Sequence, residues 1–135
     1  MLTKTAPARQ RRKKKLVDYI NWYVKIYVAS SGMQVMIDNN PAPSVPKALE
    51  YYLKAYFSLC SERLNTISAI PVTRMYRYCD YVGIEDADEF VGILESMDVE
   101  YITQMSKIQQ QQTNNAQLES KNRMLAERAK AHGLR

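Results

Sequence analysis

Apolar residues recur at helical spacing through the middle of the chain, and this periodicity limits the fold more than any other feature. Between residues 90 and 108 they are separated by steps of four, three, four, four and three. These steps place them on one face of an amphipathic helix, whose stripe is Phe90, Leu94, Met97, Tyr101, Met105 and Ile108. Asp86 followed by Glu89 predicts a capping box where this helix begins.

Three further segments are predicted to be helical. Residues 46–64 carry a second apolar stripe, and Ile70-Pro71 opens a shorter helix that ends at Gly83. Residues 15–30 are apolar except for a narrow polar stripe, and Gly32 ends that helix. Residues 38–46 contain three prolines, so an irregular loop is expected there. The sequence therefore predicts an all-α protein, a small bundle of about four helices.

Charge is distributed unevenly and suggests three regions. Residues 1–15 carry seven positive charges and no acid, residues 16–105 have a net charge of −6, and residues 106–135 have a net charge of +4. The first region lacks an apolar stripe and is expected to be a flexible basic arm. The second is the predicted helical core. The third is rich in glutamine and predicts a polar helical tail, ordered by a partner or by self-association.

The basic arm is the best candidate for contact with nucleic acid. Flexible lysine and arginine segments bind phosphate without reading sequence. The predicted phosphate-binding residues are Arg9, Arg11, Arg12, Lys13, Lys14 and Lys15. The alternative is an arm that docks on the acidic face of a neighbouring subunit, or one that only keeps the chain soluble.

Catalytic and cofactor sites are not expected. The single histidine, His132, lies in the polar tail, where it could not be held beside a nucleophile. Two cysteines and that histidine are too few and too dispersed for zinc, and no glycine-rich phosphate loop is present. The acidic run near residue 88 fits a helix start better than a calcium loop. The sequence predicts neither catalytic residues, nor metal ligands, nor a bound cofactor.

The number of cysteines indicates the cellular compartment in which the chain folds. Cys60 and Cys79 are too few for a disulfide framework, so both are expected to be buried thiols in the cytoplasm. Charged residues interrupt the apolar segment after residue 15, so a signal peptide is not expected, and no apolar run is long enough to span a membrane.

Aromatic residues are abundant for a chain of this size. The sequence has ten tyrosines and one tryptophan, more than a small core can bury with every polar group satisfied. Some of them are therefore expected in an interface. The predicted partner-binding residues are Trp22, Tyr51, Tyr76 and Tyr81.

The segment from about residue 51 to 102 resembles small proteins of tailed bacteriophages known as tail assembly chaperones. The resemblance rests on Tyr52-Leu53, Phe57, Leu59-Cys60-Ser61-Glu62-Arg63, Ile70-Pro71, Tyr78, Gly83-Ile84, Phe90, Met97-Asp98 and Tyr101-Ile102. It implies a non-enzymatic protein that binds a phage structural or assembly protein during tail assembly. It also implies a location in the host cytoplasm or the virion.

Two other functions remain open at this point. One is an oligomeric DNA-binding component of packaging or of the virion, similar to a small terminase subunit, which would use the basic arm. The other is an inhibitor or regulator of a host protein. A homo-oligomer is compatible with each of these functions, whereas contact with a membrane is not expected.

Overall fold

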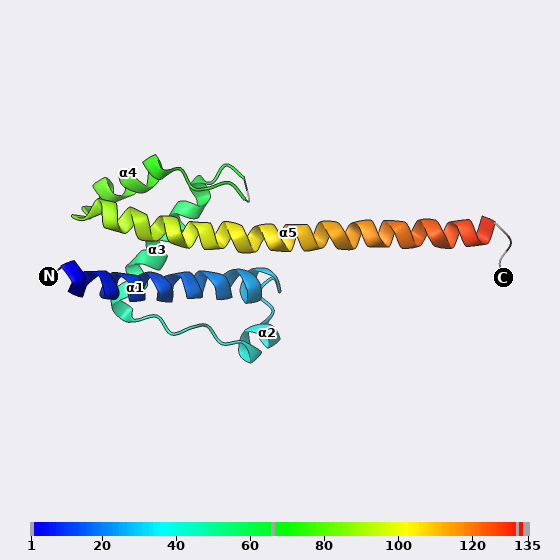
Figure 1. The fold of residues 1–135 in the computed structure, drawn as a ribbon, viewed down its shortest axis with the longest axis horizontal. Coiled ribbons are helices and arrows are strands. Elements are labelled where there is room, and N and C mark those ends of the chain that lie inside the picture. The colour runs from blue at the N-terminus through cyan, green and yellow to red at the C-terminus, as the bar shows by residue number, and fades with distance from the viewer. Residues whose placement is uncertain (1, 66, 132, 134–135) are drawn as a thin grey trace. The chain divides into compact units, whose positions relative to one another are not determined.

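The computed structural model describes residues 2–65, 67–131 and 133, with side chains from Arg9 onward. Every regular element in this part of the chain is a helix, so the prediction of an all-α protein is confirmed (Figure 1). The chain divides into two units, residues 1–105 and residues 106–135. The last helix, α5 (Ala87–Ala131), contributes its first turns to the first unit and the rest to the second.

Helix α1 (Leu2–Trp22) continues as a π-helical turn (Tyr23–Val28) and ends near Gly32, whose φ of +74° is left-handed. Leu16, Ile20 and Val24 are buried at steps of four residues. The expected start of this helix at residue 15 is wrong, because the basic residues that precede it are helical as well. Lysine, arginine, glutamine and alanine all favour helix, which explains how the apolar helix extends through them.

The connection between the first and second long segments contains a short helix that the sequence did not indicate. Helix α2 (Gln34–Asn39) has no buried residue, which explains why apolar periodicity could not predict it. The irregular loop expected over residues 38–46 begins two residues later, because residues 38 and 39 end α2; residues 40–46 are irregular, as expected from their prolines. A 3₁₀ turn (Lys47–Leu49) then leads into α3 (Glu50–Leu59), and a second 3₁₀ turn (Cys60–Glu62) ends the segment.

Helix α4 (Val72–Val82) begins after Pro71 and ends at Gly83, whose φ is +79°. Helix α5 then begins with the predicted cap, since the Glu89 backbone N–H donates to Asp86 Oδ1 at 3.3 Å. The start of α4 after Pro71 and its end at Gly83 agree with the sequence-based prediction, because proline and glycine act on local backbone geometry.

The core of the first unit lies between α1, α3, α4 and the first turns of α5 (Figure 1). Helix α1 runs alongside α5 in the same direction, as the hydrogen bond from Asn21 to Glu100 and the ion pair of Arg12 with Glu89 show. Phe90 stacks on Tyr52 of α3, with ring centroids 4.9 Å apart. The buried apolar residues that form one continuous cluster are Leu16, Ile20, Leu49, Tyr52, Ala55, Tyr56, Leu59, Ile70, Met75, Cys79, Phe90, Val91, Ile93, Leu94 and Met97.

The second unit is the remainder of α5. Every side chain of residues 109–128 is exposed. Its exposed large apolar residues are Leu118, Met124 and Leu125.

Candidate partner-binding surface

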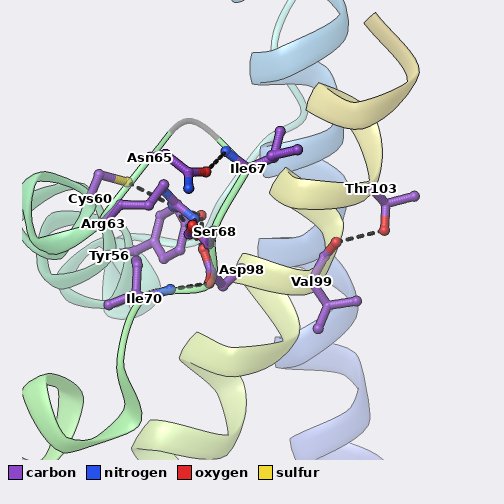
Figure 2. A network of polar contacts seen from close by, with 10 residues as sticks. All are labelled: Tyr56, Cys60, Arg63, Asn65, Ile67, Ser68, Ile70, Asp98, Val99 and Thr103. Atoms are coloured by element: carbon purple, nitrogen blue, oxygen red, sulfur yellow. Dashed lines mark hydrogen bonds and ion pairs between the residues drawn. The ribbon is translucent and has the colours of Figure 1, made fainter. Parts of the chain in front are cut away.

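A buried polar network lies in the first unit, where α3 and the segment after it meet α5 (Figure 2). Asp98 Oδ1 accepts a hydrogen bond from the Tyr56 hydroxyl at 2.9 Å and lies 2.7 Å from Arg63 Nη2. Its other oxygen, Oδ2, accepts the backbone N–H of Ile70 at 2.9 Å. Arg63 Nη1 donates to the carbonyl of Ser68 at 2.7 Å. One carboxylate on α5 therefore fastens both ends of the segment that links α3 to α4.

Burial dominates the electrostatics of this network. The side chains of Arg63 and Asp98 are only 5% and 4% exposed. Burial, followed by the nearby charge of Asp98, raises the pKa of Tyr56 well above its usual range. Burial would lower the pKa of Arg63, but the hydrogen bond to Asp98 raises it, so the guanidinium stays charged. That guanidinium also lies over the ring of Tyr101, 4.4 Å from its centroid.

The chemistry available to this network is structural. Both oxygens of Asp98 are engaged in short contacts within the chain, so the carboxylate is occupied in holding the surrounding segments together. The thiol of Cys60 lies 3.7 Å from Arg63, but burial raises its pKa and keeps it protonated. The network therefore positions the chain, and the surface of the first unit is where a partner could bind.

Two of the four predicted aromatic residues take part in packing. Trp22, at the end of α1, is half-buried and its indole N–H donates to the carbonyl of Asn40. It therefore anchors the segment after α2. Tyr51 on α3 is exposed at one face and packs on Tyr52, with ring centroids 4.3 Å apart.

The other two aromatic residues lie on α4, together with apolar residues that the sequence analysis did not single out. Met75 and Cys79 are the buried side of this helix. Tyr81 is 89% exposed, and the Tyr76 hydroxyl donates to Asp88 at the surface. The exposed large apolar residues of this helix, here called the α4 face, are Val72, Tyr76, Tyr81 and Val82. Their steps of four, five and one do not form a single stripe, so periodicity could not have identified them.

A shallow hollow adjoins Tyr81. It measures roughly 220 Å³ and is lined by Leu59, Glu62, Arg74, Arg77, Tyr78 and Tyr81. Arginine and tyrosine are both common in the central parts of protein interfaces. Tyr81 is the residue that the hollow shares with the α4 face, so the surface around Tyr81 is the best candidate for a contact surface.

The six predicted phosphate-binding residues separate into two groups on α1. Arg9 and Arg12 both approach Glu89 Oε1 of α5, at 3.2 Å and 3.0 Å. These two cations therefore help to hold α1 on α5. The remaining four are exposed: Arg11, Lys13, Lys14 and Lys15.

Metal and membrane sites were also considered. Among the described residues, no group of three or more histidine, cysteine and acidic side chains is arranged to hold a metal ion. His132 lies outside the described residues. In the same part of the chain, every helix is too short or too polar to cross a membrane.

Comparison with known proteins identifies the family. The family model for the phage tail assembly chaperone matches residues 34–103, which is half of the chain. The chain belongs to this family. The resemblance inferred from residues 51–102 is thereby confirmed, and membership supports a role in phage morphogenesis, an assembly role rather than a catalytic one.

The match with the tail assembly chaperone family divides the candidate residues. Tyr51, the α4 face and the buried Arg63–Asp98 pair lie inside the matched segment. Trp22, the basic residues of α1 and the second unit lie outside it. No curated protein and no solved structure matches the chain.

Proposed function

We propose that this tail assembly chaperone binds a phage structural or assembly protein through the α4 face, in the host cytoplasm during assembly of the tail. The observation that carries the proposal is the exposure of large apolar residues on this eleven-residue helix within the family segment, above all Tyr81, which is 89% exposed beside the hollow. Tyrosine and arginine together are common in the central parts of protein interfaces.

The α4 face is not needed to close the core. Met75 and Cys79 already pack inward from α4, so the outward residues contribute little to folding. A partner that covers Tyr81 would bury a large aromatic ring that is now almost fully exposed. Aromatic residues at the centre of an interface often carry much of its binding energy.

The buried network supports the same proposal by fixing the start of α4. Asp98 holds the backbone of Ile70, and Pro71 follows directly before the helix begins. A surface that is held in place before binding loses less conformational freedom when the partner arrives. The α4 face is therefore presented as a preorganised surface.

The test is co-purification of the tagged full-length chain from phage-infected cells, followed by titration of the phage protein that is recovered. Tyr81→Ala is expected to weaken the complex about tenfold or more while leaving thermal stability nearly unchanged. Val99→Ala, an exposed residue on α5, is the matched control and should bind like the parent chain. Equal binding by the Tyr81→Ala variant and the parent would move the contact away from α4.

Binding of nucleic acid is a second candidate function. It is supported by the four exposed cations of α1, which follow one another closely enough to contact a phosphate backbone together. In that case the protein would be a DNA-contacting packaging or virion component. Contact between Arg9, Arg12 and Glu89 reduces the number of cations available for it.

A further inference from the structure

The helix of the second unit has a heptad pattern that the function proposed above does not use. Counting in sevens from Leu118, the position called d is occupied by Gln111, Leu118 and Leu125. The position called a is occupied by Asn115, Asn122 and Ala129. Leu118 and Leu125 are 57% and 52% exposed, so the two leucines at d have no cover within this unit.

Packing against a partner would stabilise this helix. Residues 109–128 are exposed on every side, and they include several residues of low helix propensity. Helices in proteins are stabilised mainly by packing of one face rather than by propensity. A second helix lying along the a and d positions would supply that packing.

The two asparagines favour a second copy of this chain as that partner. In a parallel pair of identical helices, each residue at a faces the same residue of the other helix. Asn115 then meets Asn115, and Asn122 meets Asn122, so that each amide can donate to and accept from its counterpart. A partner helix with apolar residues at these places would leave both asparagines buried without hydrogen bonds, which is costly.

Charge decides between the two directions of pairing. In a parallel pair, position g of one helix faces position e of the next heptad of the other. Asn114 would then face Glu119, and Lys121 would face Ala126. An antiparallel pair would instead bring positions g of the two helices together, and Lys121 and Arg128 both occupy that position. Like charges there would repel, so the parallel direction is favoured.

We propose that residues 111–129 pair with the same residues of a second copy as a parallel, two-stranded coiled coil. Each chain contributes two leucines and two asparagines, so the dimer is weak and reversible. It forms in the second unit and does not depend on the α4 face.

Sedimentation of the full-length chain over a series of concentrations gives the first test. A reversible equilibrium between monomer and dimer is expected. The double variant Leu118→Lys with Leu125→Lys should remain monomeric at the highest concentration that the parent tolerates. Met124→Lys is the matched control, because Met124 is equally exposed but lies at position c. It should dimerise like the parent.

Replacing the asparagines tests whether the two helices meet along positions a and d. Asn115→Ile with Asn122→Ile should strengthen self-association at least tenfold, because polar residues at a reduce the stability of a coiled coil. A parent chain that is monomeric at every concentration would overturn the proposal. So would a double lysine variant that dimerises as well as the parent does.

Cross-linking tests the direction. Ala129→Cys is placed in a chain that also carries Cys60→Ala and Cys79→Ala, and the protein is then oxidised. A parallel pair brings the two introduced thiols together at position a, so a covalent dimer is expected. A chain that sediments as a dimer but fails to cross-link would overturn the parallel arrangement. Near-ultraviolet circular dichroism of each variant confirms that the first unit is folded.

Discussion

Asp98→Asn should destabilise the first unit more than any other replacement of one carboxylate by its amide. Asp98 balances the charge of Arg63 and accepts hydrogen bonds from Tyr56 and from the backbone of Ile70. The amide removes the negative charge and presents an NH₂ group where at least one of these donors now points. Arg63 is then buried without a counter-charge.

The expected size of the loss follows from these contacts. Removing one partner of a buried ion pair typically costs about 3–5 kcal/mol. An unpaired buried donor costs about 1–3 kcal/mol more, although the two effects overlap and do not simply add. We expect a loss of about 3 kcal/mol or more in the free energy of unfolding. That is a large share of the roughly 5–15 kcal/mol that stabilises a typical domain.

Urea unfolding followed by near-ultraviolet circular dichroism measures this loss, because the aromatic residues report on the first unit. Glu95→Gln is the matched control, since Glu95 is an exposed carboxylate on the same helix. Its effect should stay within about 0.5 kcal/mol. Adding Arg63→Met to Asp98→Asn should recover part of the loss, because no unbalanced charge then remains. A loss below about 1 kcal/mol for Asp98→Asn would refute the reasoning.

Three further predictions concern the thiols, alkaline pH and the basic residues of α1. Burial raises the pKa of Cys60, and burial followed by the charge of Asp80 raises the pKa of Cys79. A thiol reagent should therefore label both cysteines at least tenfold more slowly in the native chain than in denaturant. The folded state holds the proton of Tyr56 above pH 10 while the unfolded chain releases it, so Tyr56 contributes no loss of stability below about pH 10. Above that pH Tyr56 alone should lower the free energy of unfolding by up to about 1.4 kcal/mol per pH unit, and Tyr56→Phe should reduce the slope, as urea titrations at several pH values would detect. Any affinity for duplex DNA should depend on the exposed cations Arg11, Lys13, Lys14 and Lys15. The logarithm of the binding constant should then fall with the logarithm of the salt concentration, with a slope of about −0.9 per phosphate contacted. If replacing all four residues by glutamine leaves this slope unchanged, they do not contact the DNA.

The sequence predicted the core helices because their buried residues repeat at helical spacing. Residues 90–101 and 72–82 behave in this way, and proline, glycine and a capping aspartate mark their ends. Leu64 shows the limit of the method. It fits the stripe of residues 46–64, yet it is 85% exposed because the helical segment ends at Glu62. Nothing in the spacing alone reveals that end.

The start of α1 and the proposed contact surface were harder to predict, for different reasons. Residues before Lys15 carry no apolar stripe, and their pairing with Glu89 is a contact between residues far apart in sequence. Of the residues predicted to bind a partner, Tyr76 and Tyr81 are exposed, whereas Trp22 is used for packing; their binding role stays a prediction. Whether a given tyrosine faces outward depends on which side of its helix the neighbouring elements cover.

Asp98 is a buried polar residue that spacing could have identified. It lies four residues after Leu94 and three before Tyr101, on the face that the core requires, so a charged residue there implies a buried partner. A buried ion pair is seldom the most stable way to fill a core, and apolar residues of similar size often serve as well. They could not, however, accept the backbone N–H of Ile70, which lies outside the helices just before Pro71. The carboxylate accepts that hydrogen bond and so fixes where α4 begins. The charged pair in the core therefore has a role in positioning the chain, in addition to any contribution to stability.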